Sequence, residues 1–245
     1  MAHAGLLDTE TLYVADGVEV TTSLGDLDGD RVVHGLPARR IRSSAGQRHY
    51  PGLFWSATTG GHVWYESLLE LDRLWLADFD PQVEWIASQP MWLSGMDGAT
   101  RRRHVPDLLL KTRSGRFVLV DVKPAKFACL PEVAAVFGWT GRLAAAKGWR
   151  YEVWSGASAT LLANVRWLAR ARRLDLVDPV AREVVARVGM SGMTIGEICT
   201  AATVYVAEPL TKPAVMSLLW SGAWVTELTT PLSGASVVTW AEDVA

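Results

Sequence analysis

A hydrophobic run that leads straight into charged residues is the feature that most restricts the fold of this chain. Phe117-Val118-Leu119-Val120 is followed directly by Asp121-Val122-Lys123. Aromatic and β-branched residues of this kind predict a buried strand, here over residues 116–123. Ser114-Gly115 supplies a turn in front of it, because glycine tolerates the positive φ that such turns require. A hairpin with a second strand over residues 104–110 is therefore predicted.

The carboxylates of this hairpin are candidate metal ligands. Side chains alternate between the faces of a strand, so Asp121 and Lys123 should point the same way. Val105-Pro106-Asp107 brings a second carboxylate to the same edge of the sheet. Hard oxygen ligands suit Mg²⁺, for which Mn²⁺ can substitute, and the backbone carbonyl of Val122 would add a further ligand. The alternative is that both aspartates are strand-end carboxylates with turn or surface contacts.

Burial makes the metal interpretation the stronger one for Asp121. An unpaired carboxylate inside an apolar strand costs several kcal/mol or shifts its pKa. We therefore expect either a metal ion or Lys123 beside it.

An amphipathic segment upstream supplies a third carboxylate. The core stripe of a helix over residues 63–78 is predicted from apolar residues at helical spacing, which are Trp64, Leu68, Leu71 and Trp75. Glu66 and Glu70 lie one turn apart beside this stripe, and both could reach the metal. For either residue the alternative is a surface glutamate, with Glu70 paired to Arg73.

This set of residues predicts hydrolysis of a phosphodiester bond. A metal held by Asp107 and Asp121 would lower the pKa of a bound water and polarise the phosphate. Lys123 would orient that water or stabilise the charge of the transition state.

Local charge indicates where DNA would bind, although the net charge of −2 gives no support by itself. Basic residues are concentrated between Met96 and Lys126, and they predict a phosphate-binding face formed by Arg101, Arg102, Arg103 and Lys126. A solvated hairpin is the alternative. A second basic stretch over residues 39–49, followed by aromatic residues up to Trp55, is either a DNA-contacting arm or a solvated loop.

The remaining pattern predicts an α/β protein with two domains. The first, residues 1–174, begins with a β-rich extension over residues 1–60 that contains strands at 18–20 and 31–33. It continues with a strand at 83–87, a helix at 131–147, a strand at 151–154 and a helix at 160–173. The second, residues 175–245, has helices at 180–188, from Thr194 and at 210–224, then two strands between 225 and 240. Three small helices and a hairpin are typical of a winged-helix-like domain.

Several classes of protein are not expected. No apolar run approaches the ~18 residues that a membrane span needs, and the first residues lack the pattern of a secretory signal. Cys129 and Cys199 are far apart and lack CxxC spacing, which predicts reduced thiols in a cytoplasmic protein and no zinc site.

The motifs as a group resemble a known family. They are Glu66-Ser67-Leu68-Leu69-Glu70, Asp78-Phe79-Asp80-Pro81-Gln82-Val83, Gln89-Pro90, Pro106-Asp107 and Asp121-Val122-Lys123-Pro124-Ala125. In order and spacing, from about Tyr65 to Trp154, the chain is similar to the TnsA-like endonuclease subunits of heteromeric transposases, which belong to the PD-(D/E)xK nuclease superfamily. The first 60 residues match only loosely. The resemblance implies a restriction-endonuclease-like mixed sheet flanked by helices.

The resemblance also assigns roles to residues. The catalytic glutamate of the family falls on Glu70, because the interval to Gln89-Pro90 aligns there, and Glu66 is the runner-up. The metal-binding aspartate falls on Asp107, the next acid or amide on Asp121, and the lysine on Lys123. The implied catalytic set is Glu70, Asp107, Asp121 and Lys123, and the implied metal ligands are Glu70, Asp107, Asp121 and Val122.

The implied activity is magnesium-dependent cleavage of the 5′ strands at the ends of a mobile element in bacteria. The implied partners are double-stranded DNA, a DDE-type transposase subunit that cuts and joins the 3′ ends, and an ATPase regulator. One alternative is a stand-alone nuclease or nickase of restriction, repair or phage defence. An alternative of another class is a catalytically silent DNA-binding or scaffold protein on the same fold.

Overall fold

The computed structural model describes residues 2–39 and 50–243. Within these ranges the chain is a mixed α/β protein that divides into two compact units, Met1–Gly156 and Ala157–Ala245. Two domains were predicted, but with a boundary between residues 174 and 175. The boundary lies earlier because α6 (Ala159–Leu168) and the 3-10 turn η1 (Ala169–Ala171) pack against α9 (Glu208–Trp220) of the second unit.

The first unit is built around a mixed sheet in the order β10-β9-β8-β5. Its strands are β5 (Val83–Ser88), β8 (Leu108–Thr112), β9 (Phe117–Val122) and β10 (Arg150–Trp154). β8 runs antiparallel to β5 and β9, whereas β10 runs parallel to β9. A parallel pair needs a crossover connection, which α4 (Ala125–Ala128) and α5 (Pro131–Ala146) provide.

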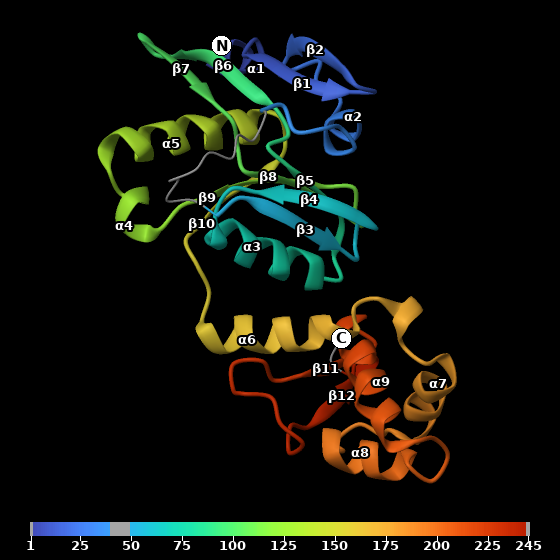
Figure 1. Ribbon diagram of the computed structural model, residues 1–245. Coiled ribbons are helices and arrows are strands. Elements are labelled where there is room, and N and C mark those ends of the chain that lie inside the picture. The colour runs from blue at the N-terminus through green and yellow to red at the C-terminus, as the bar shows by residue number, and fades with distance from the viewer. Residues whose placement is uncertain (1, 40–49, 244–245) are drawn as a thin grey trace. The chain divides into compact units, whose positions relative to one another are not determined.

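The two faces of this sheet bury different residues, as the alternation along a strand requires. Leu109 and Leu119 contribute to a core cluster that includes Trp139 of α5. The neighbouring Leu108 contributes to a second cluster that includes residues of α3 (Leu68–Phe79). Figure 1 shows α5 and α3 on opposite sides of the sheet.

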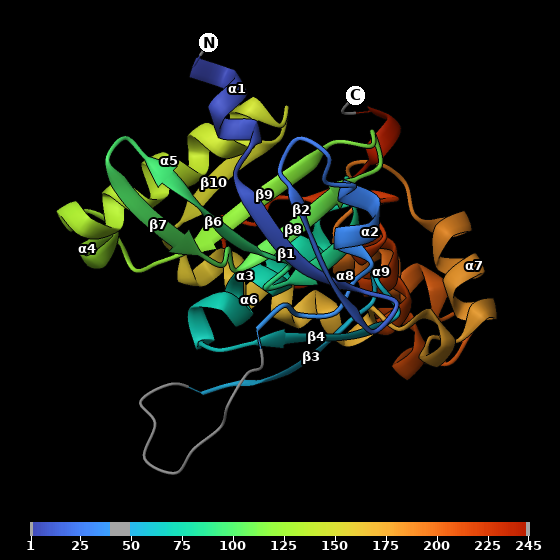
Figure 2. The same cartoon turned by 90° about the horizontal axis from the view of Figure 1, so that it is seen from above.

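Further strands flank this layer. A second sheet has the order β2-β1-β6-β7 and consists of β1 (Glu10–Ala15), β2 (Val18–Ser23), β6 (Trp92–Asp97) and β7 (Thr100–His104). Short helices α1 (Ala2–Leu7) and α2 (Gly29–Val33) accompany it. A separate hairpin of β3 (Gly52–Ser56) and β4 (Gly61–Tyr65) packs with α3. Viewed from above, the β6–β7 hairpin runs beside α5 (Figure 2).

Helix α3 begins at Leu68 and not at Val63 as predicted. Ser67 caps it, because the Ser67 hydroxyl oxygen accepts a hydrogen bond from the Glu70 N–H at 3.2 Å. The residues before the cap favour a strand and form β4, so Trp64 is an exposed residue of a strand and not part of the helix core. The buried face of α3 instead contains Leu74 and Ala77.

The strand predicted over residues 31–33 is also wrong, because these residues end the short helix α2. The cause is a helix N-cap at Asp28, which the run of charged residues around it did not indicate. Asp28 Oδ1 accepts hydrogen bonds from the N–H groups of Asp30 at 2.9 Å and Arg31 at 3.3 Å, and a short side chain that accepts in this way starts a helix.

The strand predicted over residues 104–110 is divided between the two sheets. β7 ends at His104 and β8 begins at Leu108, so residues 105–107 cross from one sheet to the other. Pro106 fits this connection because proline has no N–H to offer to a ladder. The remaining predicted elements of the first unit agree with β5, β9, α5 and β10.

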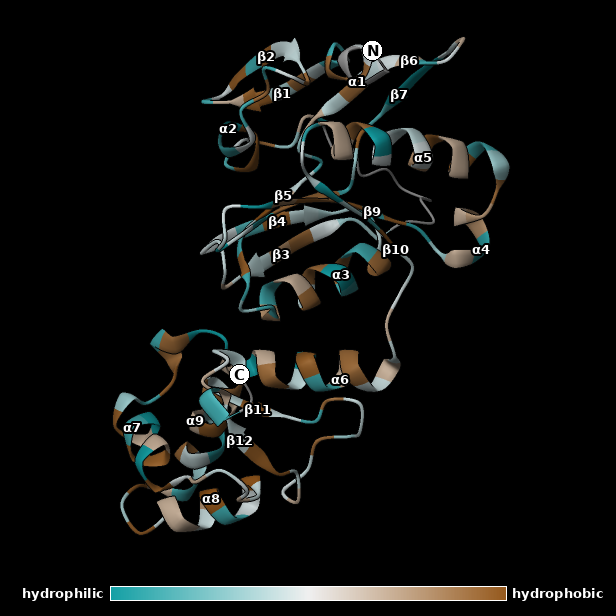
Figure 3. Ribbon diagram, turned by 180° about the vertical axis from the view of Figure 1, so that it is seen from behind, coloured by the Kyte–Doolittle hydropathy of each residue, from teal (hydrophilic) through white to brown (hydrophobic). Residues whose placement is uncertain are grey.

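The second unit contains helices and one small hairpin. Besides α6, η1 and α9 it comprises η2 (Leu174–Leu176), α7 (Pro179–Val188), α8 (Ile195–Ala202), β11 (Trp224–Thr226), β12 (Val238–Trp240) and η3 (Ala241–Asp243). The capping box predicted at the start of α8 is confirmed, with Thr194 and Glu197 bonded reciprocally. Hydrophilic and hydrophobic residues alternate along α7 (Figure 3), which buries Val184 and Val185.

No helix within the described ranges is both long and apolar enough to cross a lipid bilayer.

Candidate active site

A cavity of about 610 Å³ in the first unit brings the predicted catalytic residues together. Its lining includes Glu70, Asp107, Asp121, Val122 and Lys123. These residues come from the start of α3, the β7–β8 connection and the end of β9, which are far apart in the sequence. Three carboxylates and one lysine therefore face one space at the edge of the central sheet.

Asp107 is held by the backbone on both sides. Its N–H donates to the Val120 carbonyl at 3.0 Å, and its Oδ2 accepts from the Val122 N–H at 2.6 Å. Its carbonyl accepts from the Gln89 N–H at 2.8 Å. Gln89 is buried and has a φ of 46°, a region that a residue other than glycine occupies at a cost. Gln89 of the predicted Gln89-Pro90 motif thus helps to hold the Asp107 backbone in place.

The charge environment of Asp107 is unfavourable for a carboxylate. Burial, together with the negative charges of Asp121 and Glu70, raises the pKa of Asp107 well above its ordinary value. The Val122 N–H and the Lys123 ammonium act in the opposite direction but do not compensate. A cation placed among the three carboxylates would relieve this repulsion.

Glu70 is oriented by the same turn that starts α3. Its Oε1 accepts from the Ser67 hydroxyl at 2.8 Å, and its Oε2 accepts from the Glu66 N–H at 2.8 Å. Burial raises the pKa of Glu70, although these two hydrogen bonds oppose the shift. The alternative pairing with Arg73 is not found, because Arg73 forms a bidentate ion pair with Glu152 at 3.0 Å.

The runner-up carboxylate, Glu66, lies on the same cavity but has a different partner. It precedes the helix and forms an ion pair with Arg39, which also lines the cavity. Because Glu66 is paired with a cation and Glu70 faces the other carboxylates, Glu70 is the better placed of the two.

Asp121 is buried, with 1% of its surface exposed, and its neighbours are not the expected ones. Neither oxygen has Lys123 as its hydrogen-bond partner. Oδ1 lies 2.8 Å from His104 Nε2, and Oδ2 accepts from the Tyr151 hydroxyl at 2.5 Å. Sequence reasoning missed both residues, because His104 ends a strand of the other sheet and Tyr151 lies on a distant strand. The signal available was the parallel pairing of two strands around a crossover helix, which could have placed Tyr151 beside Asp121.

The chemistry of the donors fits a divalent cation such as Mg²⁺. Three carboxylates and the Val122 carbonyl supply hard oxygen atoms, and burial together with the neighbouring negative charges raises the pKa of Asp107. Among the described residues, no three His, Cys, Asp or Glu side chains are already gathered as a closed ligand set.

The predicted basic face is only partly available for phosphate. Arg102 forms an ion pair with Asp97 at 2.7 Å, whereas Arg103 stacks over Trp92 at 3.9 Å from the ring centre. Arg101 and Arg103 alternate with Arg102 and His104 along β7, so they lie on the face away from His104. Lys126 is exposed in α4 and lies over the ring of Phe127, which lines the cavity. Of the predicted arm over residues 39–55, residues 40–49 lie outside the described residues.

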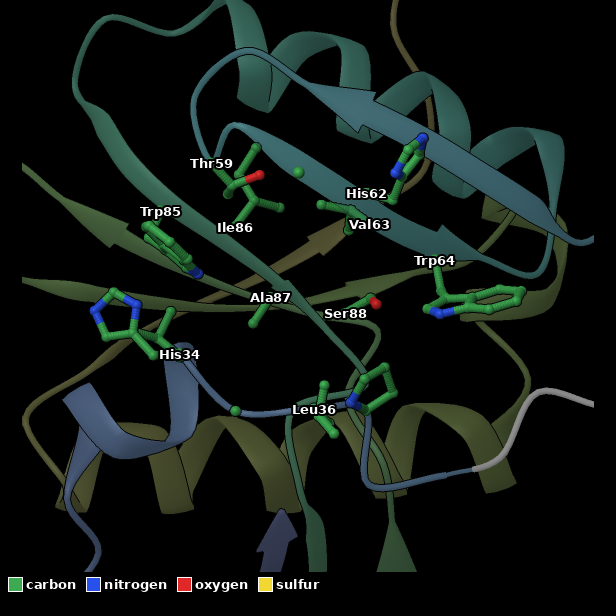
Figure 4. A pocket seen from close by; sticks show the side chains of 14 residues that line it. His34, Leu36, Thr59, His62, Val63, Trp64, Trp85, Ile86, Ala87 and Ser88 are labelled. Atoms are coloured by element: carbon green, nitrogen blue, oxygen red, sulfur yellow. The ribbon is translucent and has the colours of Figure 1, made fainter. Parts of the chain in front are cut away.

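A second cavity, of about 200 Å³, lies elsewhere in the first unit. Figure 4 shows His34 beside Trp85 at one end and Trp64 at the other. The rings of His34 and Trp85 meet edge to face at 4.3 Å. No carboxylate is among the described residues that line this cavity, so the charged oxygen ligands of the first cavity have no counterpart in it.

Comparison with known proteins assigns no family to this chain. No protein-family model matches it, and no curated protein matches it.

Proposed function

We propose that this protein is a magnesium-dependent DNA endonuclease of the TnsA-like kind, acting in the bacterial cytoplasm on the 5′ strands at transposon ends. The observation that carries the proposal is the single cavity lined by Glu70, Asp107, Asp121 and Lys123. The four residues were selected from the sequence alone, from three separate segments. Their convergence is what a catalytic role requires and what four unrelated surface residues would rarely produce.

The architecture supports the finer fold assignment. The elements α3, β5, β8, β9, α5 and β10 follow the order helix, strand, hairpin, helix, strand around a mixed sheet, which supports a restriction-endonuclease-like fold. In the second unit, α7, α8 and α9 directly precede β11 and β12, and an isolated bridge joins Thr194 to Val237. This bridge just before α8, next to the hairpin, supports a winged-helix-like assignment.

Each residue of the site has a role in this proposal. Glu70, Asp107 and Asp121, with the Val122 carbonyl, would hold Mg²⁺ or Mn²⁺. The bound ion supplies charge neutralisation of the phosphate and a water of lowered pKa. Lys123 would orient the attacking water or stabilise the negative charge that develops on the phosphate. Its own backbone is fixed, because the Lys123 N–H donates to the Trp154 carbonyl at 2.9 Å.

The second unit fits a protein partner better than a DNA duplex. Its helix α9 follows a helix and a turn, as a reading helix would, but it is buried from Ala214 to Trp220. The turn between α8 and α9 exposes apolar side chains instead, with Val204 77% and Tyr205 64% exposed. We therefore assign this unit to docking of the DDE-type transposase subunit or its ATPase regulator, and the first unit to double-stranded DNA.

A catalytically silent DNA-binding or scaffold protein is the second candidate. The observation that favours it is the pairing of both Asp121 oxygens within the protein, because a carboxylate satisfied in this way is stable without a metal. A stand-alone nuclease of restriction, repair or defence would share the same site and differ only in its partners.

Metal binding and cleavage together decide between these candidates. Isothermal titration of Mg²⁺ and Mn²⁺ into the wild type should give binding at millimolar concentration or below, and Asp107→Ala should lose it. Asp175→Ala is a matched control, because Asp175 is exposed in the second unit and paired with Arg173. Absence of binding to the wild type, even with duplex DNA present, would leave the scaffold as the better description.

Lys123→Ala separates an enzyme from a metal-binding scaffold. This variant keeps every proposed ligand, so it should bind Mn²⁺ like the wild type. It should nick supercoiled plasmid at least ~100-fold more slowly, the loss usual for one charge-stabilising group. Equal nicking by the variant would remove Lys123 from the mechanism.

A further inference from the structure

The Asp121 carboxylate is fixed by two side chains that belong to different parts of the fold. His104 Nε2 lies 2.8 Å from Oδ1, and the Tyr151 hydroxyl lies 2.5 Å from Oδ2. The Tyr151 hydroxyl donates to Asp121 Oδ2, and the Nε2–H tautomer of His104 donates to Oδ1. Each carboxylate oxygen has two lone pairs, and one contact each therefore leaves acceptor capacity for a cation.

The strand pairing explains how Tyr151 reaches Asp121. β10 runs parallel to β9 with Val153 opposite Asp121. Tyr151 lies two residues before Val153 and therefore projects from the same face of the sheet as Asp121. At this position the phenolic O–H of Tyr151 is directed at Asp121 Oδ2 as a hydrogen-bond donor.

Helix α5 in turn holds both donors. The helix lies against β7 and β10 (Figures 1 and 2). Phe137 meets the His104 ring edge to face at 6.2 Å. Gly141, one turn further on, lies under the Tyr151 ring, and a Cβ at this position would sit 3.0 Å from Tyr151 Cδ1.

The glycine is informative because a helix interior disfavours it. Glycine at position 141 lowers the stability of the helix, but it leaves space for the Tyr151 ring that a Cβ atom would otherwise crowd. Phe137 and Gly141 are one turn apart on the same face, so a single stripe of α5 sets the positions of both donors.

We infer that His104 and Tyr151 are positioning residues of the metal centre: they fix the Asp121 carboxylate for the cation, and α5 fixes them through Phe137 and Gly141. The inference rests on the proposed metal-dependent function. Outer-shell partners of this kind orient a ligand before the metal arrives, and their loss typically costs about 10–100-fold in metal affinity.

Manganese binding to the full-length protein tests this inference. Free Mn²⁺ is measured by electron paramagnetic resonance during titration of the wild type, Tyr151→Phe and His104→Gln. We expect each variant to bind Mn²⁺ about 10–100-fold more weakly. Tyr13→Phe is the matched control, because Tyr13 is also a buried tyrosine of the first unit but lies on β1, and its affinity should equal that of the wild type.

A third variant separates positioning from general stability. Gly141→Ala favours the helix but crowds the Tyr151 ring. It should therefore weaken Mn²⁺ binding without lowering the melting temperature of the protein. If Tyr151→Phe fails to fold, His104→Gln and Gly141→Ala carry the test.

The outcomes are distinct. If the wild type does not bind Mn²⁺, the proposed function itself fails. If the wild type binds and folded Tyr151→Phe and Gly141→Ala bind equally well, the positioning role is overturned. A directly coordinated nitrogen in the pulsed spectrum of the wild type would make His104 a ligand and overturn its role as a positioning residue.

Discussion

At the scale of single residues, Asp107 carries the greatest electrostatic cost in the site. Its carboxylate is surrounded by protein and by two further carboxylates, and its hydrogen bond from the Val122 N–H does not compensate. Such a group is stable when neutral or when a cation is bound. Asp107 therefore favours metal binding, but it destabilises the metal-free protein at pH values above the pKa of its carboxyl group.

Asp107→Asn should make the metal-free protein more stable at pH 8. The folded-state pKa of Asp107 lies above the ordinary 3.8. The protonated carboxyl group therefore contributes to folding stability at low pH, and this contribution is lost as the pH rises through the folded-state pKa. Asparagine keeps the acceptor for Val122 and has no charge to lose. We expect a melting temperature about 2–4 °C higher at pH 8, the change that ~1 kcal/mol produces in a domain of this size.

The gain should shrink as the pH is lowered toward 4, because wild-type Asp107 then becomes neutral as well. Addition of millimolar Mg²⁺ should stabilise the wild type and not the variant, since binding to the folded state alone raises stability. A variant that is less stable than the wild type at pH 8 would contradict this account of the Asp107 charge.

At the scale of elements, the start of α3 serves the fold and the site together. Ser67 accepts from the Glu70 N–H to cap the helix, and its hydroxyl donates to the Glu70 carboxylate. The same arrangement occurs at the start of α8, where Thr194 and Glu197 form a capping box. This second cap does not line the cavity of the proposed metal site. The two caps form a natural pair for comparison.

Ser67→Ala and Thr194→Ala should each cost about 1 kcal/mol of folding stability, the usual contribution of an N-cap. Only Ser67→Ala should also weaken Mn²⁺ binding, because Glu70 loses a donor that orients it. Thermal unfolding and manganese titration of both variants check this expectation. Equal effects on metal binding, or none in either variant, would show that the cap does not orient Glu70.

The same elements explain what the sequence could predict. Apolar strands with a turn between them and an alanine-rich helix carry strong local signals, so β9, α5 and the carboxylates on the hairpin were predictable. The start of α3 was not, because Trp64 of β4 falls in helical register with Leu68 although the Ser67 cap separates them. The partners of Asp121 were hidden because β7 and β10 approach β9 only through long-range packing.

At the scale of the whole molecule, the proposed metal centre lies entirely within one compact unit. Every residue that lines its cavity precedes Gly156, where the first unit ends. β10 ends at Trp154, just before this boundary, so the last strand of the central sheet is included. The second unit has a core of its own around α9, in which Val215, Leu218 and Leu219 are buried.

A fragment of residues 1–156 should therefore fold and bind Mn²⁺ with the affinity of the full chain. Shortening it to residues 1–148 removes β10 and should abolish both properties. Circular dichroism and manganese titration of the two fragments check this expectation. Loss of metal binding in a folded fragment of residues 1–156 would mean that the second unit contributes to the site.

The late position of β10 has a consequence for protein synthesis. All four proposed catalytic residues have been translated once Lys123 is added, but the strand that carries Tyr151 has not. A nascent chain at that point lacks both the parallel partner of β9 and the hydroxyl that holds Asp121. We expect ribosome-bound chains that still lack β10 to have no competent metal centre, which would keep the proposed nuclease inactive until its core sheet is complete.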